Sequence, residues 1–325
     1  MASSAECGDV GLIRFTAIGN GIKKGYEKMK LQFRYDTTGN WYKGNTHIHS
    51  NASDGGMSLD KITTLYAGAG YKFLFQTDHW VSSDNSARST QDAPLLWLDG
   101  IELDGTDETG SPFHVVCLGK VPPMDRKMGL VPAMAEARKH GAMLILAHPF
   151  WCGNSAADAI RHNFDGVEVY NHVCHWINAK GEGTIHWEAM LHHYAGTRVF
   201  ASDDAHLCEA HPGWNGGWIV VNSPRLASED ILHSIKKGNY YASMGPDFVN
   251  IENASSKVKI STSPIVRAWL VGPRWLGKRF AKNAEELFTE AEFDVPSEWP
   301  FVHIEIEDVR GKRAWTNTLF INHSV

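Results

Sequence analysis

The stretch Asn45–Gly55, NTHIHSNASDG, determines how we interpret the rest of the chain. His47 and His49 alternate along a short apolar run, so on a β-strand both side chains point to the same side. A polar turn follows at once and carries the carboxylate of Asp54. Two imidazoles with an acid just beyond them are typical of a metal site, although a lone His-x-His pair is also common on a simple polar strand face.

Composition limits the possible classes of protein. A length of 325 residues suits one large domain plus a smaller one. A net charge of -6 offers no basic stripe for nucleic acid, and no apolar run is long enough to span a membrane. The N-terminal residues do not resemble a signal peptide, and five scattered cysteines without a CxxC pair are typical of reduced thiols. We therefore predict a cytoplasmic protein. Twelve tryptophans predict a large aromatic core or an aromatic-lined cleft.

From Lys43 onward, short apolar strands alternate with helices. Several of these strands are wholly apolar, which predicts a parallel sheet covered on both sides, and their number favours a barrel. The predicted strands are 71–76, 95–101, 113–118, 142–147, 165–171, 198–201 and 218–221, and the predicted helices are 59–69, 130–140, 187–194 and 228–237.

After Gly245-Pro246 the helical pattern stops and alternating strands follow, at 258–260, 265–270 and 301–306. Residues 309–312 are expected to form a hairpin turn. We divide the chain into an N-terminal β extension (1–42, with a strand at 30–35), a large domain (43–248) and a small C-terminal β domain (249–325). The tail and the N-terminal strands are expected to form one small antiparallel unit.

Polar residues of metal-ligand type occur where the predicted strands end. In a barrel the carboxyl ends of the strands converge on one face, so residues far apart in sequence meet there. A single histidine at a strand end is usually a hydrogen-bonded surface residue, but six such positions in the same phase predict a polynuclear metal site. The six positions are His47/His49, His79, Glu102, His148 and Asp204/His206 at strand ends, and His114 on a strand.

Taken together, these motifs resemble the PHP (polymerase and histidinol phosphatase) metallohydrolases over residues 43–250. The matching motifs are His47-Ile48-His49 with Ser53-Asp54-Gly55, Thr77-Asp78-His79, Gly100-Ile101-Glu102, His148-Pro149 and Asp204-Ala205-His206. The resemblance implies a distorted (β/α)7 barrel that carries two or three divalent metal ions, manganese, iron or zinc.

The resemblance also assigns the ligands. A first metal would be held by His47, His49, Glu102 and Asp204; a second by Glu102 as a bridge with His114 and His148; and a third by Asp54, His79 and His206. Family members often have a histidine at the position of Asp54, which puts occupancy of the third site in question. Asp78 is expected to orient a ligand rather than to be one.

The second half resembles the carbaryl-hydrolase-like (CehA/McbA) branch of the family more closely. The residues that carry this resemblance are 166–171, 238–246 and 302–317. It indicates the architecture better than the substrate.

These features predict a metal-dependent hydrolase, with a phosphoesterase as the leading hypothesis. A hydroxide between the first two metals would attack the ester, and Asp204 or His206 would transfer the proton. The alternative is hydrolysis of a carboxyl or carbamate ester or an amide. A basic residue in the cleft would favour phosphate, and an aromatic cleft without charge would favour the alternative. A non-catalytic metal-binding module is a third hypothesis.

The substrate is expected to be a small ester, phosphorylated under the leading hypothesis, with no stable nucleic-acid or membrane partner. Candidate substrate contacts are Tyr170, Asn171, His172, Ser243 and Arg88, each with an ordinary structural explanation beside it. Glu168 alternates with core valines, which fits either a barrel-facing functional residue or a structural one. Oligomeric state is not predictable from these features.

Overall fold

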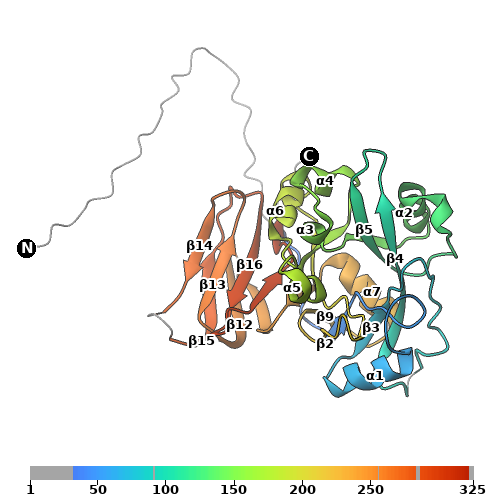
Figure 1. Cartoon of the computed structure of the whole chain (residues 1–325). Helices are drawn as coiled ribbons and strands as arrows, with labels where there is room; N and C mark the ends of the chain where they lie inside the picture. Colours follow the sequence, from blue (N-terminus) through green and yellow to red (C-terminus); the bar gives the residue numbers. More distant parts are fainter. Residues whose placement is uncertain (1–31, 91, 255, 283–285, 322–325) are drawn as a thin grey trace, which may run out of the picture.

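The computed structural model describes residues 32–90, 92–254, 256–282 and 286–321, and these form two lobes (Figure 1). We call residues 40–243 the α/β lobe, and residues 248–321 together with the strand at 32–33 the β lobe. Of the strand expected at 30–35, residues 30 and 31 lie outside the described residues.

The α/β lobe comprises β2 (Asn40–Asn45), α1 (Leu59–Gly68), β3 (Phe73–Gln76), β4 (Leu96–Thr106), β5 (Pro112–Leu118), the 3-10 helix η1 (Arg126–Met128), α2 (Leu130–Lys139), β6 (Met143–Leu146), α3 (Pro149–Cys152), α4 (Ala156–Arg161), β7 (Gly166–Asn171), α5 (His172–Asn178), α6 (Thr184–His193), β8 (Arg198–Ser202), β9 (Trp218–Ser223), α7 (Ser228–Lys237) and β10 (Tyr240–Ser243). The β lobe comprises β1 (Gln32–Phe33), β11 (Phe248–Ala254), β12 (Lys257–Ile265), β13 (Arg267–Val271), β14 (Gly277–Phe280), β15 (Phe288–Asp294), β16 (Phe301–Glu307), β17 (Arg313–Thr316) and β18 (Phe320–Ile321).

Local sequence signals explain the longer helices. In α2 the buried residues Leu130, Ala133, Met134 and Ala137 are spaced three and four apart, so one stripe of the helix faces the sheet. Helix α7 has the predicted bounds and ends at Gly238, whose φ of 82° suits a residue without a Cβ. The short helices α3, α4 and α5 were not predicted, because four to seven residues are too few to show a helical period.

Most strands belong to one large mixed sheet. Its α/β part contains two parallel runs, β2–β3–β4 and β6–β7–β8, and β5 joins them by antiparallel pairing with both β4 and β6. On the other side of β2, the sheet continues through β9, β10 and β17 by antiparallel pairing.

The closed (β/α)7 barrel expected from the sequence is not confirmed. In the described part of the chain, β8 is paired only with β7, and the sheet has an open end there. The reason is that both edges of β9 are occupied by β2 and β10, and both edges of β10 by β9 and β17. The strands that would accept β8 instead extend the sheet into the β lobe.

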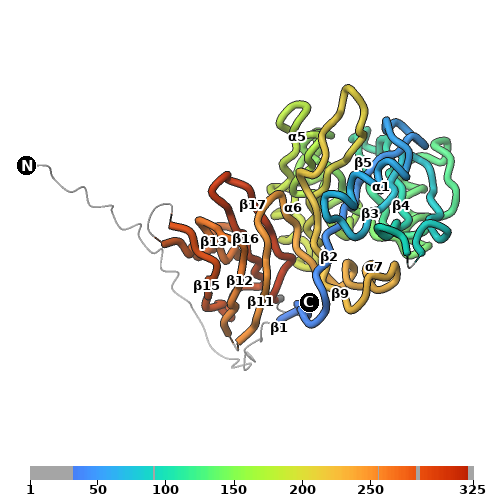
Figure 2. Tube along the Cα trace, turned by 90° about the horizontal axis from the view of Figure 1, so that it is seen from below, coloured from blue at the N-terminus to red at the C-terminus, as the bar shows by residue number. Residues whose placement is uncertain are grey.

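The β lobe is antiparallel throughout, as the alternating tail sequence predicted. Strands β16 and β17 form the expected hairpin, in which Gly311 has a φ of 73°. A separate three-stranded sheet, β11–β12–β15, packs its apolar residues against those of β13 and β16. The N-terminal strand β1 pairs with β18 and lies beside the β lobe (Figure 2). The domain boundaries given above stay a prediction.

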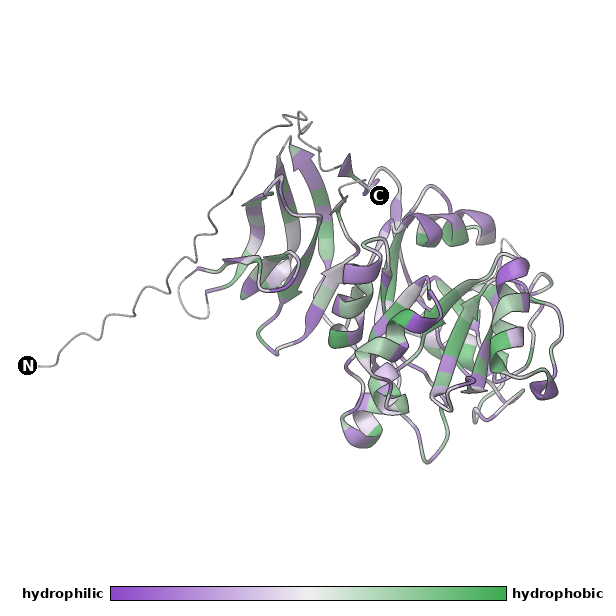
Figure 3. Ribbon diagram, turned by 90° about the horizontal axis from the view of Figure 1, so that it is seen from above, coloured by the Kyte–Doolittle hydropathy of each residue, from purple (hydrophilic) through white to green (hydrophobic). Residues whose placement is uncertain are grey.

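Hydrophobic residues are concentrated on the central strands and on the inner faces of the helices (Figure 3). A large cluster fills the α/β lobe, and a second fills the β lobe. A third cluster lies under α1 and includes Ile48, Ile62 and Leu74, so it supports the segment that carries His47 and His49. Among the described helices, none has the length and apolar character required to cross a bilayer.

Two buried side chains connect the lobes. The Asn317 side chain accepts a hydrogen bond from Val199 N (3.0 Å) and donates to Tyr240 O (3.0 Å) and Gly238 O (3.3 Å). His303 on β16 packs against the ring of Trp187 on α6, with 4.4 Å between ring centroids. Burial lowers the pKa of His303 from 6.5 to about 3.

This junction makes stability sensitive to acid. Below pH 6.5 the unfolded chain protonates His303 while the folded chain keeps it neutral, so the free energy of unfolding falls as pH decreases from 6.5 towards 3. We measure by urea unfolding how far the free energy of unfolding falls when the pH is lowered from 7.5 to 5. This fall should be about 2 kcal/mol smaller in His303→Phe than in wild type. His233→Phe, at an exposed position, is the control. Equal losses in wild type and both variants would contradict the prediction.

Candidate metal centre

The segment that carries His47 and His49 is not part of a regular strand, which corrects the sequence prediction. Strand β2 ends at Asn45, and Ile48 forms only an isolated parallel bridge with Ala205. The Thr77 side chain substitutes for a strand partner, because its hydroxyl accepts from Ile48 N (2.9 Å) and donates to Ile48 O (3.1 Å). The alternation still holds: Ile48 is buried in the cluster under α1, and both imidazoles face the opposite side.

Four buried side chains meet at the centre of the site. Nε2 of His47 lies 3.1 Å from Glu102 Oε2 and 3.2 Å from Asp204 Oδ1. Nε2 of His49 lies 3.1 Å from each of the same two oxygens. These atoms lack hydrogen-bond geometry: His47 Nε2, His49 Nε2 and Asp204 Oδ1 are buried without a hydrogen-bond partner in the described structure. Two imidazole nitrogens and two carboxylate oxygens facing one point are a donor set that fits a divalent cation.

The two carboxylate oxygens of Glu102 face different histidines. While Oε2 faces His47 and His49, Oε1 lies 2.9 Å from His114 Nδ1 and 3.4 Å from His148 Nε2. A carboxylate placed in this way can contribute one oxygen to each of two neighbouring cations.

A third group lies towards solvent. Asp54 Oδ2 is 3.4 Å from His206 Nε2 and 3.9 Å from His79 Nε2, and Asp54 Oδ1 is 3.5 Å from His49 Nδ1. The Asp54 side chain is 53% exposed, whereas the central carboxylates are almost completely buried. All nine residues predicted as ligands therefore lie in one cluster, but their grouping differs in part from the expected one. The groups around His47 and Asp54 recur, with His49 added to the second, whereas His114 groups with His79 and Glu102, and His148 with Cys174 and Asp204.

The carboxylates and imidazoles perturb one another strongly. Burial acts to lower the pKa of His49, but the nearby carboxylates of Asp204 and Glu102 outweigh it and raise that pKa to about 9. Burial acts to raise the pKa of Glu102, but the imidazoles of His47, His114 and His79 hold it well below its ordinary value. The buried carboxylates thus require positive charge around them, which either protons or metal cations can supply.

The backbone is strained at two of the candidate ligands. Asp204 has a φ of 54° and His148 a φ of 28°, a region that residues with a Cβ seldom occupy. Strained residues of this kind are concentrated at functional sites.

Glu168 orients the central histidine. Its Oε1 lies 2.8 Å from His47 Nδ1 and accepts from Ser202 Oγ (2.5 Å), and its Oε2 accepts from His148 N (2.9 Å) and Asn171 Nδ2 (2.9 Å). With Nδ1 engaged in this way, Nε2 of His47 is directed at the centre. Of the two interpretations left open by the sequence, the contacts favour a functional role.

Asp203 and Asp204 are adjacent but have different contacts. Asp203 accepts from Asn45 Nδ2 (2.8 Å), Tyr66 Oη (2.8 Å) and the backbone nitrogens of Gly216 (2.7 Å) and Gly217 (3.0 Å). It therefore holds the loop before β9 against the segment after β2. The preference for Asp204 as the ligand agrees with this geometry.

Two further acids support the outer histidines and the loop. Asp104 Oδ1 lies 2.9 Å from His79 Nδ1. Burial acts to raise the pKa of Asp104, but the contacts with His79 and Arg126 outweigh it and lower that pKa to about 2. Asp78 accepts from Ser50 N (2.7 Å) and Ser53 Oγ (2.8 Å), as expected of an orienting residue. Sequence reasoning missed Asp104, although it lies two residues after Glu102 on β4 and so on the same face.

A small cleft of about 240 Å³ opens over the ligands. Its other walls are formed by Trp151, Val173, Cys174, Ile177 and His211. No lysine or arginine lines it, within the described residues. Cys174 lies beside His148 and Asp204 and was not identified from the sequence.

The predicted substrate contacts do not line this cleft. Asn171 donates to Asp204 Oδ2 (3.3 Å) as well as to Glu168, and the hydroxyl of Tyr170 lies 3.0 Å from His172 Nδ1. Ser243 is buried and donates to Pro246 O (2.7 Å). Arg88 pairs with Asp60 on α1 at 2.5 Å. Asn171 thus lies behind a ligand, and Arg88 is engaged elsewhere.

The contacts of Glu168 yield a testable prediction. In Glu168→Gln one carboxylate oxygen becomes an amide nitrogen, so at least one of its donors loses its acceptor and His47 is less firmly oriented. We expect metal affinity, measured by competition with a chelating dye, to fall about 10- to 100-fold. Glu290→Gln, on β15 of the β lobe, is the matched control. Unchanged affinity in Glu168→Gln would show that Glu168 does not position the ligand.

Comparison with known proteins gives distant structural similarities. No family model matches the chain, and no curated protein matches it. A two-domain protein from Bacteroides vulgatus that contains a predicted PHP-like metal-dependent phosphoesterase aligns over 89% of this chain and 98% of its own, at 14% identity and a TM-score of 0.47. A protein from Bifidobacterium adolescentis, provisionally described as a metal-dependent phosphoesterase, aligns over 60% of this chain and 96% of its own, at 14% identity and a TM-score of 0.41.

An amidohydrolase from Chromobacterium violaceum with bound sulfate and no metal aligns over 50% of this chain and 87% of its own, at 15% identity and a TM-score of 0.38. All three TM-scores are below 0.5, and we base no functional conclusion on them. The chain is similar in structure to PHP-like metal-dependent phosphoesterases, the family that its motifs resemble, and none of the three structures is named as a carbaryl-hydrolase-like protein.

Proposed function

We propose that this protein is a metal-dependent hydrolase, and that phosphoesters are its substrates. The observation that carries the proposal is the set of buried, unpartnered nitrogen and oxygen atoms of His47, His49 and Asp204 that face one point beside Glu102. Unpartnered polar atoms are costly to bury, so they indicate a cation that completes their coordination.

We infer that the centre holds two or three divalent cations, manganese, iron or zinc. His47, His49, Glu102 and Asp204 would hold the first, Glu102, His114 and His148 the second, and Asp54, His79 and His206 the third. Cations bound there lower the pKa of coordinated water and polarise the ester under attack, which is the chemistry that hydrolysis needs.

The protein's own residues supply positioning and proton transfer. Asp204 directs Oδ1 at the two central histidines and leaves Oδ2 beside Asn171 and Cys174, at the wall of the cleft. We propose Asp204 Oδ2 as the proton acceptor. His206 is held by a bond between its Nδ1 and Asp204 O (2.8 Å), which directs Nε2 towards Asp54. With three cations bound, this nitrogen would be a ligand; with two, a protonated His206 would be free to donate to the leaving group.

The lining of the cleft favours a second candidate. It combines Trp151, Val173 and Ile177 with no lysine or arginine among the described residues, the composition expected for hydrolysis of an uncharged carboxyl or carbamate ester or an amide. This is the chemistry of the carbaryl-hydrolase-like branch that the second half resembles. Phosphate remains our first choice because several cations would supply the positive charge that the side chains do not.

Metal content tests the proposed centre. We expect the purified, reconstituted protein to hold two or three ions per chain by elemental analysis. Asp54→Asn should lose one ion, because Asp54 serves only the outer group, while Asp204→Asn should lose ions from the buried groups as well. His140→Ala, at an exposed position, is the control and should retain all of them. A protein that binds no ion, or variants that bind as many as wild type, would overturn the assignment of the ligands.

Hydrolysis of matched p-nitrophenyl phosphate, phosphodiester, acetate and carbamate compounds tests the reaction. We expect phosphate turnover that Asp204→Asn abolishes and His140→Ala leaves intact. Turnover confined to acetate or carbamate, and lost in Asp204→Asn, would select the second candidate. A metal-loaded protein without activity towards any of the four would point to a non-catalytic metal-binding module.

A further inference from the structure

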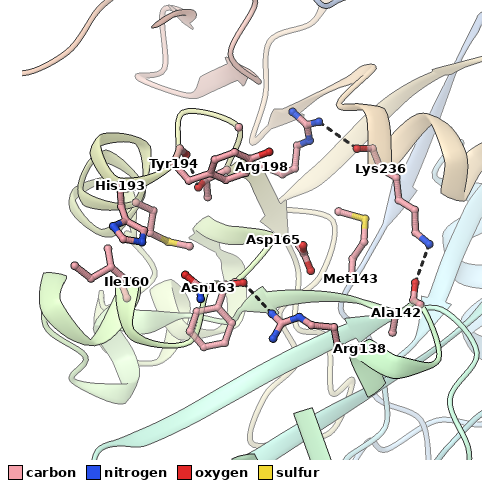
Figure 4. Close-up of a pocket in the computed structure, with 16 residues that line it drawn as sticks. Arg138, Ala142, Met143, Ile160, Asn163, Asp165, His193, Tyr194, Arg198 and Lys236 are labelled. Carbon is pink, nitrogen blue, oxygen red and sulfur yellow. Dashed lines mark hydrogen bonds between the residues drawn. The ribbon is translucent and has the colours of Figure 1, made fainter. Parts of the chain in front are cut away.

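The α/β lobe has a second cavity, larger than the metal cleft and at the opposite ends of the strands. Its volume is about 670 Å³, and it shares no lining residue with the metal cleft. It is lined where strands begin, at Met143 of β6, Asp165 before β7 and Arg198 of β8, and where helices α2, α6 and α7 end (Figure 4). The metal ligands lie at the other ends of the same strands. The cavity is therefore a separate site.

Three cations line this cavity. Arg138 Nη2 donates to Asn163 O (2.8 Å), Lys236 Nζ to Gly141 O (2.7 Å) and Arg198 Nη2 to Lys236 O (3.1 Å), as drawn in Figure 4. Each contact is to a main-chain carbonyl, which fixes the side chain without neutralising its charge. Within the described residues, none of the three forms an ion pair with a carboxylate.

Among the described residues, Asp165 is the only carboxylate in the lining, and it is already engaged: its Oδ2 accepts from Leu144 N (2.8 Å). Three cations and one carboxylate leave the cavity positive, although the whole chain has a formal charge of -6. Arg198 is only 7% exposed, and burial lowers its pKa. A buried arginine without an acidic partner is costly, and an anion bound beside it would offset that cost.

Much of the rest of the wall is apolar, with the polar residues Asn163, His193, Tyr194 and Thr197 between the apolar ones. Met143, Ile160, Phe164 and Met190 line the cavity next to the cationic groups. A purely inorganic ion would leave these side chains in contact with water, whereas a ligand with a hydrocarbon or aromatic part would cover them.

We propose that this cavity binds a small amphipathic anion, a molecule with a carboxylate or phosphate group joined to an apolar body. Arg138 and Lys236, which lie at its exposed edge, contact the anionic group together with Arg198, and the methionines and Phe164 contact the apolar part. Because the cavity is separate from the metal cleft, such a ligand is distinct from the hydrolytic substrate.

Calorimetric titration of the metal-loaded full chain tests this site. The probes are phenylacetate, benzylphosphonate and the neutral phenylacetamide. We expect at least one anion to bind, and phenylacetamide to bind more weakly. The stronger of the two anions identifies the preferred anionic group.

The double variant Arg138→Gln/Lys236→Gln should bind the anion at least about tenfold more weakly, because two charge-assisted contacts are lost. Its hydrolysis of the p-nitrophenyl substrates should equal that of wild type. Lys139→Gln/Lys237→Gln is the matched control, since it removes the same charge from neighbouring positions on the same helices. Its binding should be unchanged.

Three results would overturn the proposal: no binding of either anion, equal binding of phenylacetamide, or equal weakening in both double variants. Asp204→Asn separates the two cavities. Loss of anion binding in this variant, with binding retained in Arg138→Gln/Lys236→Gln, would place the anion at the metal centre instead.

Discussion

The convergence of buried carboxylates on one set of histidines is the constraint that the rest of the α/β lobe satisfies. Glu102, Asp204 and Glu168 all lie within contact distance of His47 or His148, and all three are buried. An uncompensated buried carboxylate costs several kcal/mol, so this arrangement is stable only with positive charge among the oxygens. The wholly buried strands β3, β6 and β8 provide the rigid support on which such a concentration of charge can be held.

The support is organised in two layers. Most residues that face the centre come from loops just beyond strands, while Glu102 and His114 lie within β4 and β5. A second set of acids fixes those loops from behind. Glu168 holds the His47 ring, Asp203 holds the loop before β9, and Asp78 holds the loop that carries Asp54. Asp203 and Asp204 divide these tasks: Asp203 fixes the loop before β9, whereas Asp204, which has a φ of 54°, faces the central histidines. Anionic residues are thus used both to bind and to orient.

Sequence reasoning identified the residues that meet at this centre because two independent signals coincided: residue type and position at or near a strand end. His148 follows an apolar run and Asp204 follows a wholly buried strand, so their placement was determined by the strands before them. That the sheet stays open was not predictable, because β10 pairs with β17, a strand distant from it in sequence. The same limit applies to His47 and His49, whose segment is held by the side chain of Thr77 rather than by a strand ladder.

Side chains outside the centre were harder to place. The loop that contains Arg88 is polar, and its sequence gave no indication that the guanidinium would form an ion pair with Asp60. Asp104 carried a usable signal, its spacing from Glu102, whereas Cys174 and Trp151 reach the cleft from short helices without a periodic pattern. The residues of the candidate metal centre are therefore recognisable from local sequence, and the lining of the cleft above them is not.

The bonds of Asn317 have a consequence for the order in which the protein can mature during synthesis. Its side chain accepts from the backbone of Val199 on β8, 118 positions earlier in the chain, and donates to Tyr240 on β10. Both strands leave the ribosome well before Asn317 does, and they remain without these bonds in the interval. The α/β lobe, although almost entirely encoded by earlier codons, can reach its final form only after translation has passed residue 317.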